Sequence, residues 1–289
     1  MTSTTINTML GGEIFFKCEN FQKIGAFKIR GALNVLLQMD PSDLKHGVCT
    51  HSSGNHAQAV ALGAKMLDLP AIIVMPSNAP VVKQAAVKGY GAQIRLCEPT
   101  LAARESTVEE VIAETGARFI HPYDDYGIIT GQATCALELL EEVPDLDLVM
   151  APVGGGGLLA GTALSVHYFH PNAKVIAGEP RGADDAYRSF KDKTLHPSES
   201  PDTIADGLLT SLGKKNFPIL LEHVSEILLA SEDQIRDAMR LIWERMKIII
   251  EPSCAVPLAA LIENNYDVKG KRVGIIITGG NVDLGKLPF

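Results

Sequence analysis

Short apolar stretches rich in isoleucine and valine alternate along the chain with longer segments of helical periodicity. Several of the short stretches are apolar at consecutive positions, which is typical of strands buried on both faces of a parallel sheet. They predict strands at 47–50, 71–75, 93–97, 146–153, 174–179 and 272–278. Helices are predicted between them at 56–67, 80–89, 101–116, 131–142 and 158–169. This alternation predicts an α/β protein with open, twisted parallel sheets.

Two other segments carry local signals. Ser231 and Gln234 form a capping-box pattern, which predicts the start of a helix that runs to about Lys247. Residues 183–212 are polar and rich in proline, serine and aspartate, so we expect a surface excursion there.

Three loops of unusual composition follow predicted strands. They are Ser52-Ser53-Gly54-Asn55-His56, Gly154-Gly155-Gly156-Gly157 and Thr278-Gly279-Gly280-Asn281. Ligands of open α/β sheets bind beyond the carboxyl ends of the strands. We therefore expect the three loops to contribute to one shared site.

The four consecutive glycines precede an apolar helix that starts at Leu158. Glycine lets a ligand approach bare backbone N–H groups, and a helix N-terminus adds positive potential. Together they predict a phosphate-binding loop. A tight turn without a ligand is the alternative. The run overlaps a dinucleotide fingerprint only loosely, so an NAD-dependent oxidoreductase is a remote rival, and the P-loop pattern is absent from the sequence.

Lys28 lies in the segment Gly25-Ala26-Phe27-Lys28-Ile29-Arg30-Gly31-Ala32. A helical pattern continues through Leu33, Leu36 and Leu37, which places Lys28 in or near the first helical turn. The positive end of a helix and burial both disfavour the ammonium form. A neutral amine can condense with an aldehyde, although a lysine taken alone is usually a solvated surface residue.

Composition narrows the class of protein. The chain has 289 residues, a net charge of −8 and no long basic block, which argues against a nucleic-acid or membrane partner. It has neither an apolar run of membrane-spanning length nor a signal-peptide pattern. The five cysteines are widely spaced and odd in number. We therefore expect buried, reduced cysteines in a cytoplasmic protein, without a disulfide framework or structural zinc.

Residues 16–32 closely resemble the cofactor-lysine segment of the serine racemases and serine/threonine dehydratases. Further matches follow in the family's order: residues 51–57, the four glycines, Ile204-Ala205-Asp206-Gly207, Glu251-Pro252 and Gly279-Gly280-Asn281-Val282-Asp283. The resemblance covers essentially the whole chain and is specific because the motifs occur in this order. It implies a pyridoxal 5′-phosphate (PLP) enzyme of the tryptophan-synthase-β-like fold.

The resemblance also implies the domain organisation. Residues 1–46 and 125–289 would form a large PLP-binding domain, and residues 47–124 a small α/β domain. The active site would lie between two open twisted α/β domains, and the protein would be a homodimer.

The family's site residues carry over by motif. Lys28 would bind PLP as a Schiff base and move protons on one face of Cα, and Asn55 would meet the 3′ oxygen. The phosphate would be held by Gly154, Gly155, Gly156, Gly157 and Leu158, and Phe27, Gly207, Glu251 and Thr278 would complete the cofactor site. The backbone of Ser52, Ser53, Gly54, Asn55 and His56 would bind the substrate carboxylate.

Ser53 and Thr278 affect the expected chemistry. Ser53 matches the serine that faces Cα opposite Lys28 in the racemases, which implies a role in racemisation. A role only in binding the substrate carboxylate, as in a pure dehydratase, is an alternative of equal weight. Thr278 replaces the family's usual serine opposite the pyridine nitrogen. A neutral hydroxyl there does not force protonation, so the ring would be a weaker electron sink, which suits β-elimination.

Two further sets of residues carry over. Glu179, Ala183 and Asp185 match the divalent-cation site of the racemase branch, and oxygen ligands of this kind suit Mg²⁺, Ca²⁺ or Mn²⁺. Arg104 and Thr210 align with positions that line the pocket for the substrate side chain. An arginine there would hold a second carboxylate, which favours 3-hydroxyaspartate; a surface arginine is the equal alternative.

The sequence departs from the family at its start, where members usually carry a longer segment before residues 14–17. Ala26 replaces the more common serine, and without a regulatory domain after Phe289 we expect no feedback control by isoleucine. We expect a dehydratase that converts L-serine and L-threonine to keto acid and ammonia, with serine racemase activity. The rivals are an L-threo-3-hydroxyaspartate ammonia-lyase, a β-replacing synthase and a non-catalytic PLP-binding protein.

Overall fold

The computed structural model describes residues 1–79 and 81–289 and divides into two compact units. Unit 1 comprises Met1–Phe27 and Gln132–Phe289, and unit 2 comprises Lys28–Gly131. Each unit contains one parallel sheet, as the alternation of strands and helices predicted. Unit 2 includes α2 (Lys28–Gln38), because this helix packs on α3 (Asn55–Met66).

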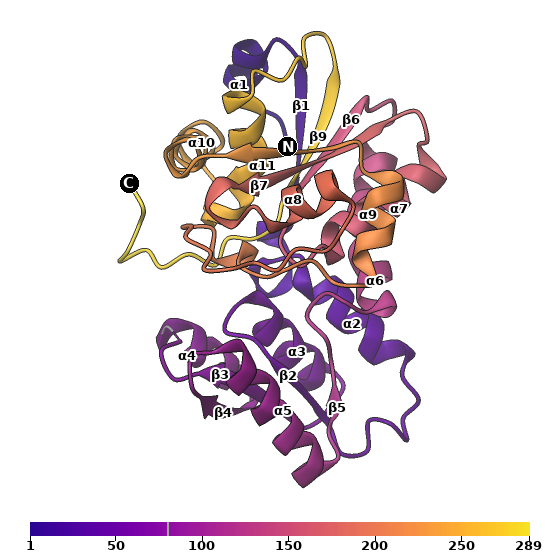
Figure 1. Ribbon diagram of the computed structural model, residues 1–289, viewed down its shortest axis with the longest axis vertical. Helices are drawn as coiled ribbons and strands as arrows, with labels where there is room; N and C mark the ends of the chain where they lie inside the picture. The colour runs from indigo at the N-terminus through magenta and orange to yellow at the C-terminus, as the bar shows by residue number, and fades with distance from the viewer. Residues whose placement is uncertain (80) are drawn as a thin grey trace. The chain divides into compact units, whose positions relative to one another are not determined.

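The sheet of unit 1 has five strands, all parallel to their neighbours, in the order β1-β9-β6-β7-β8 (Figure 1). They are β1 (Glu13–Cys18), β6 (Leu148–Pro152), β7 (Lys174–Pro180), β8 (Glu226–Ala230) and β9 (Arg272–Ile277). The helices of this unit are α1 (Thr4–Leu10), α6 (Tyr126–Glu142, which begins in unit 2), α7 (Gly157–Phe169), α8 (Asp185–Asp192), α9 (Asn216–His223), α10 (Glu232–Met246) and α11 (Pro252–Glu263).

Helices cover both faces of this sheet, which explains why its strands are apolar at consecutive positions. Val273 and Ile275 of β9 belong to one buried cluster with residues of α10 and α11. Gly274, between them, faces the other side: a Cβ built on it would lie 2.7 Å from Cδ2 of Leu139 in α6. The period-2 alternation of a strand thus places successive residues against different helices.

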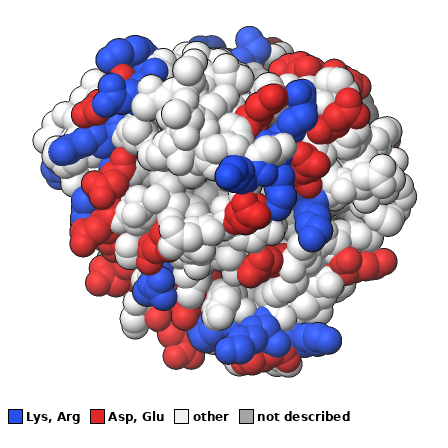
Figure 2. Space-filling model, turned by 90° about the horizontal axis from the view of Figure 1, so that it is seen from above, with Lys and Arg blue, Asp and Glu red and all other residues white. Residues whose placement is uncertain are grey.

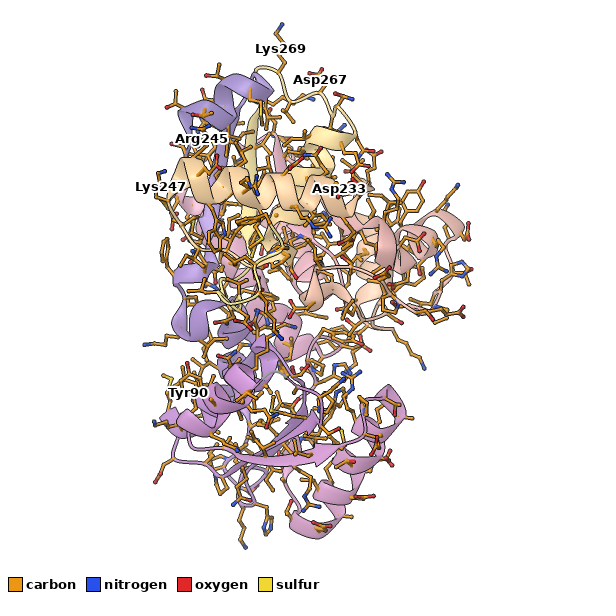
Figure 3. All side chains as sticks on the ribbon, turned by 90° about the vertical axis from the view of Figure 1, so that its left-hand side faces the viewer. Tyr90, Asp233, Arg245, Lys247, Asp267 and Lys269 are labelled. Atoms are coloured by element: carbon orange, nitrogen blue, oxygen red, sulfur yellow. The ribbon has the colours of Figure 1, made fainter. Side chains whose placement is uncertain are left out.

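The capping-box prediction for α10 is confirmed. Ser231 is the N-cap, and its side chain accepts a hydrogen bond from the backbone N–H of Gln234. Lys247, with a φ of 60°, ends the helix. Figure 3 shows Asp233 near the start of α10 and Arg245 near its other end, where each charge complements the helix dipole.

The sheet of unit 2 has the order β4-β3-β2-β5, and all its strand pairs are parallel. The strands are β2 (Val48–His51), β3 (Ala71–Pro76), β4 (Gln93–Cys97) and β5 (Arg118–Phe119), and two further helices are α4 (Val81–Gly89) and α5 (Leu101–Thr115). Cys49 and Val74 of the sheet pack with Val108 and Val111 of α5. The helix predicted at 80–89 corresponds to α4. The first residue of that prediction, Pro80, lies outside the described residues.

Several elements differ from the prediction. Helix α6 begins at Tyr126 and not at Gly131, because Oδ1 of Asp125 accepts hydrogen bonds from the amides of Gly127 and Ile128 in its first turn. The prediction missed β1, β5 and β8 and several helices. The surface excursion at 183–212 is wrong in part, because α8 forms there with Asp185 and Ser189 buried.

The cysteines agree only in part with the expectation. Cys49, Cys135 and Cys254 are buried, whereas Cys18 and Cys97 are only half-buried, against the expectation. Among the helices of the described residues, none combines the length and hydropathy required of a membrane span. On the face shown in Figure 2, basic and acidic side chains are interspersed.

Candidate active site

The glycine loop follows β6, at the point in unit 1 where the strand order reverses. β7 lies on one side of β6 and β9 on the other, and such switch points are where open α/β sheets bind ligands. All four glycines are buried, and Gly156 has a φ of +90°. No side chain caps the start of α7. The loop therefore leaves the first amides of a helix to a ligand, as an anion site requires.

Residues 207–216 pack against this loop. A Cβ built on Gly154 would lie 3.0 Å from Cα of Leu208. The carbonyl oxygen of Gly155 accepts hydrogen bonds from the amide of Gly213 (3.1 Å) and the side chain of Asn216 (2.7 Å). The structure thus brings the 207–208 segment to the predicted phosphate loop, whereas Thr210 of the same segment is exposed.

A second group of predicted residues gathers after β9. The backbone carbonyl of Thr278 accepts a hydrogen bond from the amide of Phe27 (3.0 Å), and the carbonyl of Gly279 accepts one from the amide of Glu251 (3.1 Å). Glu251 and Thr278 are buried. Because β9 pairs with β6, this group and the glycine loop lie at the ends of neighbouring strands. The second and third predicted loops are therefore adjacent in unit 1.

Cys254 is a residue of this group that the prediction missed. Its Sγ contacts Oγ1 of Thr278 at 3.1 Å and the backbone of Gly279. Burial, followed by the charge of Glu251, raises the pKa of the Cys254 thiol. The sequence offers one signal for it: Cys254 lies three residues after Glu251, in the first turn of α11.

The candidate metal residues meet at the end of β7. Both carboxylate oxygens of Glu179 accept hydrogen bonds from backbone amides of α8, those of Ala186 (2.8 Å) and Tyr187 (2.7 Å). Burial, followed by the charge of Asp185, raises the pKa of Glu179 to about 9, and burial raises the pKa of Asp185 to about 6. Oδ2 of Asp185 is buried without a hydrogen-bond partner. Two buried, mutually repelling carboxyl groups with an unsatisfied oxygen fit a bound cation.

Unit 2 holds Lys28 and the serine-rich loop. Lys28 is the first residue of α2, as predicted, and its Nζ donates a hydrogen bond to the carbonyl of Pro122 (2.7 Å). Residues 52–56 follow β2, which lies between β3 and β5 at the reversal point of its own sheet. The N-cap of α3 is Gly54, without a side-chain cap. This loop therefore also presents helix amides to an anion.

His51 precedes this loop, and His56 is its last residue. His56 is buried, its Nε2 lies 3.1 Å from the carbonyl of Ile120, and burial followed by the charge of Lys28 lowers its pKa well below the usual value. His51 has its pKa lowered to about 4, first by burial and then by the charge of Arg104. The charge of the half-buried Arg104 therefore acts on His51, the last residue of β2. Both histidines are neutral near pH 7.

The match to a protein-family model covers residues 1–279, and the family is described as "Pyridoxal-phosphate dependent enzyme". The chain is 50% identical to a β-hydroxyaspartate dehydratase of Paracoccus denitrificans (strain Pd 1222), over 100% of this chain and 91% of the relative.

Two solved structures are also similar. The serine racemase of Dictyostelium discoideum has a TM-score of 0.94 and 49% identity, over 98% of this chain and 92% of the other. A threonine deaminase from T.th. has a TM-score of 0.93 and 41% identity, over 98% of this chain and 92% of the other. Both structures share the α/β fold with parallel sheets described above. This chain therefore belongs to the family of pyridoxal-phosphate dependent enzymes.

Proposed function

We propose that this protein is a PLP-dependent ammonia-lyase that converts L-serine to pyruvate and ammonia and L-threonine to 2-oxobutanoate and ammonia. We also propose that it interconverts the enantiomers of serine. The observation that carries the proposal is the buried glycine loop with its uncapped helix N-terminus. Similarity to a serine racemase and a threonine deaminase over nearly the whole chain supports it.

The residues of unit 1 fit a phosphorylated cofactor. The uncapped amides of α7 suit a phosphate, so residues 154–157 and Leu158 would hold that group. Thr278 would face the ring nitrogen, with Phe27, Gly207 and Glu251 around it. Asn55 of unit 2 would bind the 3′ oxygen. PLP supplies an aldehyde that binds amines and a ring that withdraws electrons from the bond being broken.

Lys28 and the serine-rich loop would act on the substrate. The amides of residues 52–56 would bind its carboxylate at the start of α3. Nζ of Lys28 would hold the cofactor and, once displaced by the substrate amine, remove the Cα proton. The carbonyl of Pro122 accepts a hydrogen bond from Nζ, which directs the amine. The β-hydroxyl would then leave as water, with the proton that Nζ of Lys28 removed from Cα.

Ser53 would make racemisation feasible. Racemisation requires a proton donor on each face of Cα, whereas elimination requires removal on one face only. The Ser53 hydroxyl would donate on the face opposite Nζ of Lys28. Substitution of Ser53 should therefore separate the two activities.

The test supplies purified protein with PLP and Mg²⁺, and with L-serine or L-threonine in separate reactions. Keto acid is measured in both, and D-serine in the serine reaction. Ser53→Ala should abolish D-serine and retain part of the keto acid, whereas Ser106→Ala, an exposed serine of α5, should change neither. The absence of keto acid from both substrates would contradict the proposal.

A second candidate is an L-threo-3-hydroxyaspartate ammonia-lyase. It is favoured by the charge of Arg104, which acts on His51 next to the serine-rich loop, and by the 50% identity to a β-hydroxyaspartate dehydratase. Arg104 would bind the second carboxylate, with Thr210 at the side-chain pocket. Arg104→Ala should then raise the KM for 3-hydroxyaspartate far more than that for serine. An equal rise for both substrates would argue for a general role of Arg104.

We further propose a divalent cation, Mg²⁺, Ca²⁺ or Mn²⁺, at Glu179, Asp185 and the carbonyl of Ala183. No group of three or more histidine, cysteine or acidic side chains able to hold a metal occurs in the described residues, so backbone oxygen and water would complete the shell. The buried, partnerless Oδ2 of Asp185 supports this site. Isothermal titration of chelator-treated protein with Mg²⁺, Ca²⁺ and Mn²⁺ tests it, and Asp185→Asn should abolish the binding.

We also propose a homodimer. Phe21 and Ile249 are large apolar side chains with 67% and 48% exposure, and their segments are joined by a hydrogen bond from Asn20 to the carbonyl of Ile249. Exposed apolar surface of this kind favours association. Sedimentation velocity tests the proposal, and a monomer at all concentrations would contradict it.

A further inference from the structure

Two donors from one segment hold the backbone carbonyl of Gly155 in the glycine loop. Nδ2 of Asn216 donates a hydrogen bond to this oxygen at 2.7 Å, and the backbone amide of Gly213 donates another at 3.1 Å. Gly155 and both donor residues are buried. A carbonyl oxygen has two lone pairs, and here each has a partner. The oxygen of Gly155 is therefore kept turned toward residues 213–216.

The same peptide unit carries an amide that points the other way. The described residues contain no cis peptide bond, so the unit between Gly155 and Gly156 is trans. In a planar trans peptide the C=O and N–H bonds point in opposite directions. The amide of Gly156, the N-cap of α7, is therefore directed away from Asn216.

Glycine alone would not keep this orientation. Residues 154–157 have no Cβ, so the peptide unit between Gly155 and Gly156 can rotate at little steric cost. A reversed unit would present its carbonyl oxygen, which carries partial negative charge, where the amide now lies. That oxygen would repel an anion, whereas the amide attracts one. The orientation of the loop thus depends on partners outside it.

Asn216 supplies this support from a fixed position. It is the first residue of α9 and is 0% exposed. The amide of Phe217 donates a hydrogen bond to the carbonyl of Gly213 (3.0 Å), which links the start of α9 to the second donor. Helix α9 packs on α7 (Figure 1), and Cβ of Asn216 lies 3.1 Å from the position of a Cβ built on Gly156. The side chain therefore reaches the loop from a buried and well-anchored helix start.

We propose that Asn216 is a positioning residue for the cofactor phosphate: by holding the carbonyl of Gly155, it directs the amide of Gly156 toward the phosphate. The proposal rests on the part of the proposed function that assigns the phosphate to residues 154–157. Asn216 acts through the peptide unit between Gly155 and Gly156. Its contribution therefore depends on the phosphate. It strengthens the binding of PLP and not that of pyridoxal, the same aldehyde without a phosphate.

The experiment compares these two ligands. The full chain, freed of cofactor, is titrated with PLP and separately with pyridoxal, and each Kd is obtained from the change in ligand absorbance. Asn216→Ala should weaken PLP binding about tenfold, the equivalent of one hydrogen bond, and leave the Kd for pyridoxal unchanged. Urea denaturation of each variant shows whether it is folded.

A second variant and a matched control make the test specific. Asn216→Leu also removes the donor but keeps nearly the same side-chain volume, so it serves where Asn216→Ala leaves a destabilising cavity. It should show the same selective loss of PLP affinity. Ser165→Ala removes another buried hydrogen bond from a side chain to a backbone carbonyl, that from Ser165 of α7 to Ala133 (2.8 Å), and should leave both Kd values unchanged.

The outcomes separate this inference from the proposed function. Equal losses of PLP and pyridoxal affinity in a folded Asn216 variant, or no loss of PLP affinity, overturn the role of Asn216, and the proposed function survives because the parent still binds PLP and forms keto acid. A parent that binds PLP no more tightly than pyridoxal overturns the phosphate-binding role of the loop and this inference with it. A parent that forms no keto acid but shows the selective loss overturns the proposed reaction and leaves the role of Asn216 standing.

Discussion

Substitution of Gly156 by alanine tests the glycine loop most directly. Gly156 is the N-cap of α7 and has a φ of +90° and a ψ of −8°, a region that residues with a Cβ rarely adopt. A Cβ there would also lie 2.9 Å from Cδ2 of Leu212 and 3.1 Å from Cβ of Asn216. Gly156→Ala therefore imposes both a strained dihedral angle and a clash.

The magnitude follows from the two effects. The left-handed conformation costs about 1–2 kcal/mol for a residue with a Cβ. Overpacking a buried site costs about 1–3 kcal/mol, because Leu212 and Asn216 are themselves buried. The free energy of unfolding should thus fall by about 2–5 kcal/mol. Gly270 is the matched control in the same unit: its φ is +69°, but nothing lies within 4 Å of its Cβ position, so Gly270→Ala should lose only the first part.

The assay compares urea denaturation of the two variants with that of the parent, followed by fluorescence titration with PLP. Gly156→Ala should also weaken PLP binding, because shifted amides no longer converge on the phosphate, whereas Gly270→Ala should not. Equal losses of stability in the two variants would refute the clash. An unchanged PLP affinity in Gly156→Ala would refute the phosphate-binding role of the loop.

Two further predictions concern α10 and the candidate metal site. Ser231→Ala should lower the free energy of unfolding by about 1 kcal/mol, measured by urea denaturation, because α10 loses its N-cap; no loss would contradict the cap. The raised pKa of Glu179, about 9, means that the metal-free folded protein binds a proton that the unfolded chain releases near its ordinary pKa. In EDTA, this group should therefore lower stability as pH rises between about 5 and 9, by up to about 1.4 kcal/mol per unit. Mg²⁺ requires ionised carboxylates, so the Tm gained from Mg²⁺ should grow with pH, and Glu179→Gln should remove the part of that dependence above about pH 6, the pKa of Asp185; a gain independent of pH in the parent would contradict the linkage.

Local signals account for the parts of the site that the sequence predicted. Lys28 begins α2 because the apolar periodicity through Leu36 starts there, and periodicity can be read without knowing the fold. Gly156, which has a positive φ, is one of four consecutive glycines, and such a run can be recognised in the sequence alone. The order of motifs along the chain then indicated the family. The roles of individual residues carried over from it stay predictions.

Contacts between distant segments explain what the sequence did not reveal. Cys254 and Thr278 meet only because the start of α11 packs beside the end of β9. Helix α11 itself gave no amphipathic signal, because it is apolar on all sides, and Pro257 lies inside it. Helix α8 is polar, yet Glu179 caps its amides from the end of β7. These contacts form between segments that the sheet brings together, so a short stretch of sequence does not reveal them.

The two sheets place their candidate binding loops by the same rule. The glycine loop follows β6 between β7 and β9, and the serine-rich loop follows β2 between β3 and β5. Each loop leads into a helix without a side-chain cap, α7 in unit 1 and α3 in unit 2. Both would bind anions through backbone amides, one a phosphate and the other a carboxylate. This explains why the sequence marks them with glycine and serine and not with arginine or lysine: the backbone supplies the positive potential, and small residues leave it accessible.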